Sequence, residues 1–586
     1  MISSSKYLLI QILFYCTIYP FATGYGGTKQ FNPRPNIIVI MADDMGFNDV
    51  SFHGSDQILT PNIDALGYNG IILNKHYTPA MCTPSRSALL TGKYPMNIGM
   101  QHYVIPNDEP WGLPLKETIM PEILKKGGYS TYLVGKWHQG FHKRAFTPTM
   151  RGFDYHFGYY GGYIDYYQHY LEMIGKPYAK GYDMRRNFQP IANETSGRYA
   201  TDLFTDEAVD LIYQHDQSQP MFLCFAHLAP HTGNENDPLQ APPETIAKFQ
   251  HIKDPLRRTY AAMIDKLDES IGRIIEALYD TQMLHNSIVL FYSDNGAPSQ
   301  GLHSNSGSNY PFRGQKDSPW EGGLRTPAAI WSPYLMSQHN TVANTLIHVT
   351  DWLPTLAAAA GINIPIEIQL DGKNIWDQLQ RGYPSPRWNI VHNIDEIFGY
   401  SSYSTLKWKL VNGSRIEDYN GWLGSKTNES DPRAEDYVNL ILNSTVNEVM
   451  SKLNAEIYMK LLTKDQILAL RKSAIVDCPT RNLTDAECNP SKSPCLFDIE
   501  NDPCERYNLA DRFPQDLERL KSDVEYFRLH TEKPVRVPAD PACDPRYYNL
   551  TWTWWQDLTD NAASPSVHVK NVIVFVIVFV CISILF

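Results

Sequence analysis

The sequence predicts an α/β protein in which helices flank a large central β-sheet and a smaller C-terminal α+β domain carries an antiparallel sheet. Short, wholly apolar runs rich in β-branched residues, such as residues 36–42, are typical of buried strands. Segments with helical periodicity alternate with these runs as far as about residue 360. After about residue 382, short alternating runs and closely spaced cysteines replace this rhythm, which indicates a second domain.

The elements of the larger domain follow one another in a βα order. We expect strands over residues 36–42, 130–134, 221–226, 287–292 and 325–331, and helices over residues 115–128, 196–213, 255–279 and 348–360. The segment 153–170 is dense in Tyr, Gly and His, and we interpret it as an irregular loop. Residues 418–477 are polar and poorly periodic in their first half, which favours an insertion packed loosely on the surface.

A chain of 586 residues is longer than a domain with a single hydrophobic core usually is, so two domains are expected. The predicted divisions are a signal peptide, a catalytic domain, a smaller α+β domain and a C-terminal tail, over residues 1–24, 34–381, 382–548 and 549–586. The net charge of −12 argues against a nucleic-acid partner, because such a chain offers no basic field for phosphates. It does not exclude an anionic substrate that a few local cations bind.

Both ends of the chain indicate export. Lys6, the apolar run 7–16 and the small residues 22–24 form a signal-peptide pattern. Residues 572–586 are apolar but shorter than the roughly 20 residues that span a bilayer, and small residues and a polar spacer precede them. This pattern predicts a GPI-attachment signal removed from about residue 562, with a short spanning anchor as the alternative. We expect a protein on the extracellular face of the plasma membrane, or else a lysosomal or secreted one.

Sequons and cysteines fit the secretory pathway. Six Asn-x-Ser/Thr sequons offer glycosylation sites: Asn193, Asn412, Asn428, Asn443, Asn482 and Asn549. Five late cysteines predict local disulfides with one cysteine left over: Cys478, Cys488, Cys495, Cys504 and Cys543. Cys224 lies in an apolar run and is expected to be buried, whereas Cys82 has no nearby cysteine to pair with.

Oxygen ligands follow two of the predicted strands. Asp43 and Asp44 follow the strand 36–42, and Asp294 and Asn295 follow the strand 287–292. The carboxyl ends of strands are where α/β sheets place ligands. A set of oxygen donors without a Cys/His pattern favours a hard divalent cation, with Ca²⁺ preferred to Mg²⁺.

Cationic and proton-donating side chains are expected around this metal: Arg86, Lys136, His138, His231 and Lys316. Lys136 and His138 stand two residues apart, so in extended structure they face the same side. A metal surrounded by cations describes a site for a tetrahedral oxyanion, either sulfate or phosphate.

Cys82 begins the segment Cys82-Thr83-Pro84-Ser85-Arg86, which continues through Gly92 and Lys93. Pro84 suits a first helical turn, and Thr83 or Ser85 is a candidate helix cap. By itself the cysteine is equally compatible with a packing role and with chemistry.

These motifs carry a resemblance to a known family. The segment that begins at Cys82 resembles the sulfatase signature, and Gly135-Lys136-Trp137-His138 resembles the second signature of that family. The segments 320–323, 351–355 and 391–395 resemble the arylsulfatase B (N-acetylgalactosamine-4-sulfatase) branch. The resemblance extends over residues 35–393, more weakly to Cys543, and implies the alkaline-phosphatase-like sulfatase fold.

The resemblance implies a reaction and a role for each site residue. A formylglycine-generating enzyme oxidises Cys82 to Cα-formylglycine, one hydroxyl of its hydrate attacks sulfur, and loss of the second hydroxyl's proton expels sulfate. The implied metal ligands are Asp43, Asp44, Cys82, Asp294 and Asn295. Arg86 and Lys136 hold the formylglycine hydroxyls, His138 is the base, and His231 and Lys316 bind sulfate and protonate the leaving oxygen.

The chain departs from the branch pattern in two places. His231-Thr232-Gly233 stands where arylsulfatase B relatives have His-Glu-Pro-Leu, so His227 remains an alternative to His231. No cysteine occurs between residues 105 and 145, where those relatives carry them, so Cys543 is expected to lack its usual partner.

The predicted substrate is a sulfated carbohydrate or a smaller sulfate ester, such as an aryl sulfate or a glucosinolate. A phosphatase or phosphonate esterase of the same superfamily and a surface protein whose site has decayed are the alternatives.

Overall fold

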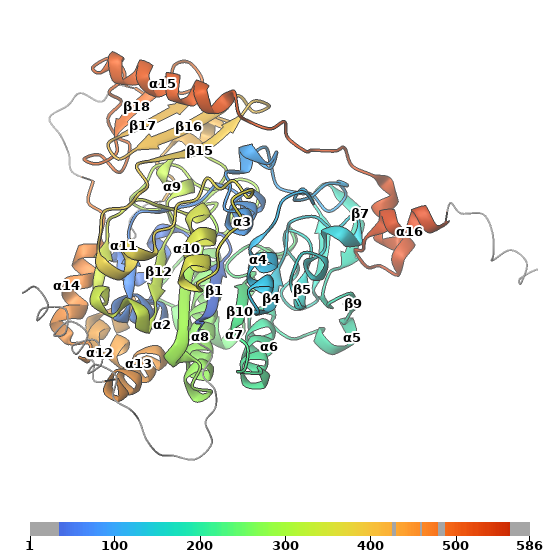
Figure 1. Ribbon diagram of the computed structural model, residues 1–586, viewed down its shortest axis with the longest axis horizontal. Helices are drawn as coiled ribbons and strands as arrows, with labels where there is room; N and C mark the ends of the chain where they lie inside the picture. Colours follow the sequence, from blue (N-terminus) through green and yellow to red (C-terminus); the bar gives the residue numbers. More distant parts are fainter. Residues whose placement is uncertain (1–33, 425–428, 458–459, 479–486, 563–586) are drawn as a thin grey trace, which may run out of the picture.

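The computed structural model describes residues 34–424, 429–457, 460–478 and 487–562 (Figure 1). The predicted signal peptide, the apolar tail, Asn428 and Asn482 lie outside these ranges. Among the described residues, no helix is long and apolar enough to cross a membrane. Asn193, Asn443 and Asn549 are exposed and Asn412 is half-buried, so these four sequons lie within reach of solvent.

A ten-stranded mixed sheet forms the centre of the molecule, in the order β13-β2-β12-β11-β1-β10-β4-β5-β8-β9. Its parallel middle is made of β11, β1, β10, β4 and β5, which span Ser287–Ser293, Asn36–Ala42, Met221–Ala226, Ser130–Lys136 and Tyr155–Tyr159. The flanking strands β13, β2, β12, β8 and β9 span Thr341–Ala343, Ile71–Leu73, Ala328–Trp331, Arg185–Arg186 and Gln189–Pro190. The predicted α/β sheet is therefore confirmed.

Two groups of helices flank this sheet (Figure 1). The first group is α2, α6 and α8, which span Pro61–Asn69, Ala200–Gln214 and Pro255–Asp280. The second group is α3, α4 and α10, which span Cys82–Thr91, Met120–Lys126 and Trp352–Ala359. Shorter helices α5, α7, α9, α11 and α16 span Ala192–Thr195, Pro243–Ile246, Glu321–Leu324, Trp376–Arg381 and Trp555–Ala562. Two further pairs of strands, β3 with β14 and β6 with β7, span His76–Tyr77, Ile347–His348, Tyr170–Met173 and Lys176–Tyr182.

Helix α8 illustrates how local sequence determines an element. Asp254 caps it by accepting hydrogen bonds from the backbone N–H groups of Leu256 and Arg257, and Pro255 occupies the first helical position. The predicted apolar stripe along the helix, which includes Met263 and Ile271, is fully buried.

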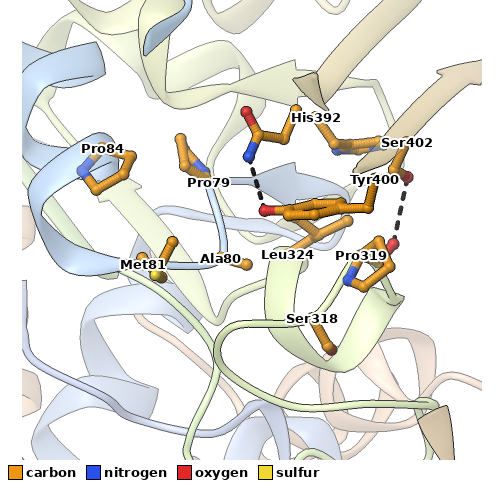
Figure 2. Close-up of a pocket in the computed structure, with 11 residues that line it drawn as sticks. Pro79, Ala80, Met81, Pro84, Ser318, Pro319, Leu324, His392, Tyr400 and Ser402 are labelled. Carbon is orange, nitrogen blue, oxygen red and sulfur yellow. Dashed lines mark hydrogen bonds between the residues drawn. The ribbon is translucent and has the colours of Figure 1, made fainter. Parts of the chain in front are cut away.

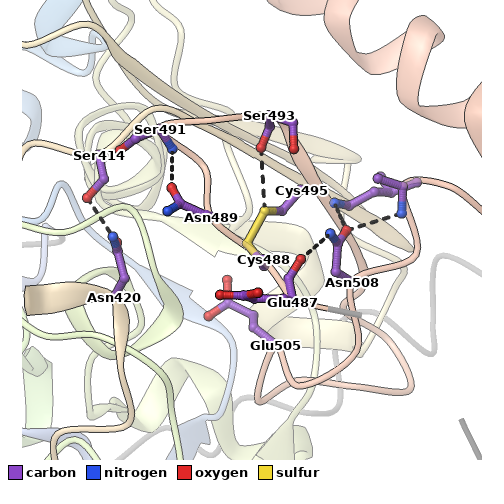
Figure 3. The surroundings of a disulfide bond; sticks show 12 residues. Ser414, Asn420, Glu487, Cys488, Asn489, Ser491, Ser493, Cys495, Glu505 and Asn508 are labelled. Atoms are coloured by element: carbon purple, nitrogen blue, oxygen red, sulfur yellow. Dashed lines mark hydrogen bonds between the residues drawn. A yellow bond between two sulfur atoms is a disulfide. The ribbon is translucent and has the colours of Figure 1, made fainter. Parts of the chain in front are cut away.

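The smaller antiparallel sheet forms as predicted, in the order β15-β16-β17-β18, over Asn389–Asp395, Tyr400–Thr405, Trp408–Asn412 and Cys495–Asp498. Helix α15, Pro514–Arg528, covers this sheet (Figure 1). Disulfides join Cys478 to Cys504 and Cys488 to Cys495, the second within the loop that leads into β18 (Figure 3). Cys543 is buried and unpaired, as expected from the odd number of late cysteines.

Two expectations from the sequence are wrong. Residues 155–159 form strand β5 of the main sheet and not a loop. Their side chains show no strand-like pattern, but their backbone pairs with β4. The described part of segment 418–477 is not loosely packed: α12, α13 and α14, over Tyr437–Leu442, Thr445–Glu456 and Lys464–Ala474, join the main hydrophobic core. Figure 1 shows these helices beside α2 and α8, although their sequence follows strands of the smaller sheet.

Candidate active site

The register of the central strands brings the predicted oxygen ligands together. Ala42 at the end of β1 pairs with Ser293 at the end of the parallel strand β11, so Asp43 and Asp294 follow side by side. Asp44 has a left-handed backbone (φ 67°), and its N–H donates to Asp294 Oδ1 at 3.2 Å. Asn295 donates its side-chain amide to Asp44 Oδ1 at 2.6 Å. All four residues are fully buried.

Three cations lie against these three carboxylates. Arg86 donates from Nε and Nη2 to Asp294 Oδ2, at 3.1 and 2.8 Å. Lys136 Nζ lies 2.7 Å from Asp43 Oδ2, and Lys316 Nζ lies 2.7 Å from Asp44 Oδ2. Burial is the largest influence on Asp44 and Asp294 and raises the pKa of each carboxyl, an effect that the nearby cations oppose.

The ligand set fits a hard divalent cation. Asp43 Oδ1 and Asn295 Oδ1 are buried oxygens without a hydrogen-bond partner, as expected of atoms that bind something other than protein. Asp43, Asp44 and His231 also hold ligand atoms within 4.8 Å of one another. His231 therefore lies directly beside the oxygen ligands expected from the sequence.

Cys82 is the first residue of α3 and is buried. Burial raises the pKa of its thiol, although Lys136 and Lys316 lower it in part. An unmodified thiol at this position therefore stays protonated and is a poor nucleophile. Met81 is the N-cap residue of helix α3, and no side chain makes a capping hydrogen bond there. The predicted caps at Thr83 and Ser85 are therefore wrong.

Thr83 instead connects the loops around the site. Its hydroxyl donates to the carbonyl of His138 at 3.3 Å and accepts the N–H of Ile105 at 3.2 Å. Lys136 is the last residue of β4, and His138 beyond it is left-handed (φ 53°), so extended structure is not what aligns the two. Both side chains still reach the site, because the chain turns after the strand.

His138 contacts Cys82 directly. Its Nδ1 lies 3.4 Å from Cys82 Sγ, and its Nε2 lies 3.1 Å from the carbonyl of Ile105. Since a carbonyl only accepts hydrogen bonds, Nε2 carries the proton and Nδ1 presents a lone pair to Cys82. Burial, then Lys136 and Arg86, hold the pKa of the imidazole well below its usual value, so the ring is neutral.

The structure separates the two candidate histidines. His231 Nε2 lies 3.5 Å from Asp44 Oδ2, and its ring lines the cavity that Cys82 also lines. His227 points elsewhere, with Nε2 at 3.2 Å from the hydroxyl of Ser270 on α8. His231, to which the resemblance assigns the sulfate-binding role, therefore lies at the cavity, and His227 does not.

A cavity of about 440 Å³ opens from Cys82, His138, His231 and Lys316 toward the surface. His303 lines it as well and was not expected from the sequence. Its ring lies 5.1 Å from that of His231, and its Nδ1 is 2.9 Å from the hydroxyl of Thr232. His303 belongs to an irregular loop, where no periodic pattern exists to identify it.

The smaller sheet supports the loop that leads to Cys82. Figure 2 shows Ala80 and Met81 of that loop, together with Pro84 of α3, facing His392, Tyr400 and Ser402 of β15 and β16 across a small cavity. Ser402 donates its hydroxyl to the carbonyl of Pro319 at 3.2 Å. Ala80 also belongs to the same buried hydrophobic cluster as Val391 of β15, so the smaller sheet packs against the loop that leads to Cys82.

Comparisons with known proteins agree with this geometry. The sulfatase family profile matches residues 35–362. Arylsulfatase J of Mus musculus is 36% identical over 551 residues, which cover 91% of this chain and 81% of that protein. N-acetylgalactosamine-6-sulfatase of Homo sapiens is 33% identical over 378 residues, which cover 61% and 68%.

A solved structure with the same fold is that of Ps i-CgsB, with a TM-score of 0.66 and 26% identity, covering 86% of this chain and 94% of that one. A second structure of Ps i-CgsB contains k-i-k-neocarrahexaose, and its TM-score is 0.65 at 26% identity.

Proposed function

The chain belongs to the sulfatase family and is a sulfuric ester hydrolase, and from that premise we propose that Cys82, oxidised to Cα-formylglycine, is its nucleophile. The observation that carries the proposal is the buried ring of three carboxylates and three cations beside Cys82 and His138. Their formal charges cancel, and a divalent cation together with a singly charged sulfate ester adds one positive charge, far less than either a bare divalent ion or an uncompensated carboxylate cluster would leave buried.

Asp43, Asp44, Asp294, Asn295 and the modified Cys82 would hold Ca²⁺. The two unpartnered oxygens and the all-oxygen character of the set support this assignment. When bound, the ion supplies a fixed positive charge that offsets charge on the ester oxygens.

The formylglycine hydrate supplies one hydroxyl that attacks sulfur and a second whose deprotonation expels sulfate. His138 is the base for the second step, since its Nδ1 faces Cys82 and is unprotonated. Arg86 and Lys136 orient the hydroxyls from the floor of the site, where both are fixed by ion pairs.

Lys316 and His231 act on the ester and its leaving oxygen. The pKa of Lys316 is raised because Asp44 and other negative groups outweigh its burial, so the ammonium stays protonated and can donate a hydrogen bond. His231 donates Nδ1–H to the carbonyl of Thr232 at 2.7 Å, and burial together with Lys316 lowers the pKa of its imidazole, so Nε2 faces the site as a lone pair in the free enzyme. His231 protonates the leaving oxygen only as the imidazolium, the form that the negative charge of a bound sulfate ester favours.

For the substrate we propose a sulfated carbohydrate of the N-acetylgalactosamine 4-sulfate type. The arylsulfatase B motifs at residues 320–323, 351–355 and 391–395 support it, as do relatives named for N-acetylgalactosamine 6-sulfate. Small esters such as aryl sulfates or glucosinolates are the alternative class.

The test of the mechanism is mass spectrometry of the peptide His76–Arg86 from active protein. We expect formylglycine at position 82, and the Cys82→Ala variant should have no activity. Active protein that contains only intact cysteine would contradict the mechanism.

We also propose that residues 1–24 direct export and that the chain is GPI-anchored after removal of the tail from about residue 562. The two disulfides, which form in oxidising compartments, support export. Phosphatidylinositol-specific phospholipase should release the protein from intact cells. Retention on the membrane with Phe586 still present would contradict the GPI anchor and favour a spanning one.

A further inference from the structure

We call the part of the cavity lined by Cys82, His138, His231 and Lys316 its sulfate end. Apart from these residues, the cavity wall carries three cations, and each is paired with a carboxylate that also lines the cavity. The pairs are Arg536 with Glu109, Arg415 with Asp317, and Lys176 with Asp108. The Arg536–Glu109 separation is 3.1 Å. These six side chains therefore contribute no net charge to the wall.

The carboxylates are held more firmly than their surface position suggests. Glu109 is only 7% exposed, and it also accepts the indole N–H of Trp111 at 2.6 Å. The guanidinium of Arg415 lies against the rings of Tyr103 and Phe398, at 4.4 and 4.3 Å from their centroids. Because these groups are fixed, turning a cation away from its carboxylate toward a ligand would break several contacts at once.

The rest of the cavity wall is mostly apolar. Tyr163, Leu171, Leu302 and Tyr419 are among the residues that line it. Such a surface favours a leaving group with an aromatic or aliphatic face.

From this pairing we propose that the cavity selects esters whose alcohol carries no second anionic group, and that Glu109, Asp317 and Asp108 act as specificity determinants against polysulfated substrates. A second sulfate would meet cations that are already neutralised and carboxylates that repel it. The net charge of −12 also gives no long-range attraction to polyanions. This inference rests on the proposed function and narrows its substrate class to monosulfated esters of uncharged alcohols and phenols.

The test compares kcat/KM for three probes: 4-methylumbelliferyl sulfate, N-acetylgalactosamine 4-sulfate and N-acetylgalactosamine 4,6-disulfate. We expect both monosulfated probes to exceed the disulfate by about tenfold or more, since one repelled charge is worth at least ~1.4 kcal/mol. Turnover of the disulfate at a rate equal to the monosulfate would overturn the inference. Loss of turnover on all three probes would instead overturn the proposed function.

Glu109→Gln sharpens the test, because it removes the charge that neutralises Arg536 while glutamine can still accept the Trp111 hydrogen bond. We expect kcat/KM for the disulfate to rise about threefold or more relative to that for the monosulfates, with this relative gain falling as salt is added. Glu532→Gln is the matched control: it removes the same charge from an exposed pair with Lys116 that lies outside the cavity. An unchanged ratio of disulfate to monosulfate in Glu109→Gln would overturn the role of Glu109.

A second pair of variants tests the apolar wall. Leu302→Ser should raise KM for 4-methylumbelliferyl sulfate about fivefold, as expected for losing roughly 1 kcal/mol of apolar contact. Leu406→Ser changes a similarly exposed leucine outside the cavity and should leave KM unchanged. Equal KM values in the two variants would show that the wall does not contact the leaving group.

Discussion

At the scale of single residues, the hydrogen bonds of His138 decide which of its nitrogens acts. Nε2–H donates a hydrogen bond to the carbonyl of Ile105, and Nδ1 is left facing Cys82. In the proposed mechanism, a base in this orientation would act on the covalent sulfated enzyme and not on the leaving group.

We therefore expect His138→Ala to release about one equivalent of alcohol per enzyme in a rapid burst and then to turn over only slowly, with sulfate retained on residue 82. The remaining steady-state rate should fall by about 10²–10⁴, the usual contribution of a general base. A stopped-flow burst with a chromogenic aryl sulfate and intact-mass analysis measure both. Steady turnover without accumulation of sulfated enzyme would contradict this role.

The second prediction at this scale separates His231 from His227. His231→Gln should lower kcat most for esters with poor, basic leaving groups, because those need protonation in the transition state. His227→Gln removes a histidine of the same burial that contacts Ser270 rather than the cavity, so its kcat should show no such dependence. A plot of log kcat against leaving-group pKa for both variants checks this, and equal slopes would contradict the assignment.

At the scale of elements, helix α13 shows how a segment distant in sequence becomes part of the catalytic domain's core. Val446, Met450 and Leu453 on its inner face are buried, and the helix packs on α2 and α8. The polar first half of the segment concealed this amphipathic helix. Burial of its apolar face then stabilises the folded state of the larger domain.

We predict that Leu453→Ala lowers the free energy of unfolding of the larger domain by about 2–5 kcal/mol, the usual cost of truncating a fully buried leucine. Leu468→Ala on the neighbouring helix α14 alters a leucine that is 47% exposed and should cost less than half as much. Denaturant unfolding followed by loss of activity measures both. Similar losses for the two variants would contradict tight packing of this segment.

At the scale of the whole molecule, a buried ionic network joins the smaller sheet to the active-site region. Lys409 on β17 lies 2.9 Å from Glu321 on α9 and 2.7 Å from Glu505. Tyr77 also donates its hydroxyl to Glu321, at 2.7 Å. Burial raises the pKa of Glu505 to about 7, with the nearby charge of Glu321 adding to this rise and Lys409 opposing it.

The sign of the resulting pH dependence follows from linkage. The folded protein holds the Glu505 proton more tightly than the unfolded chain, so this stabilisation is complete below pH ~4.5 and is lost as the pH rises through about 7. Glu505→Gln mimics the protonated form. We expect it to match the wild type near pH 5 and to be more stable at pH 8, by up to roughly 3 kcal/mol.

Thermal or denaturant unfolding at pH 5 and pH 8 checks this prediction. Asp502→Asn, at a buried acid in the same loop whose carboxylate accepts a backbone N–H from Tyr507, is the control and should not become more stable at pH 8. A wild type that gains stability between pH 5 and pH 8 relative to Glu505→Gln would contradict the assignment.

The sequence by itself determined the residue types of the site and the identity of the central strands. Asp43, Asp44, Asp294 and Asn295 follow apolar strand runs, and strands of this kind meet in a parallel sheet in which their carboxyl ends share one edge. The motif that starts at Cys82 and the apolar stripe of α8 could likewise be predicted from the sequence, because each depends on residues close together in the chain.

Only the tertiary structure decided the remaining features. It placed His231 and not His227 at the site, added His303, brought α12–α14 to the main core and paired the cations of the cavity wall with carboxylates. The physical reason is common to all four. Local periodicity indicates which face of a segment avoids water, whereas contacts between residues far apart in the chain depend on strand register and loop paths that no local pattern encodes.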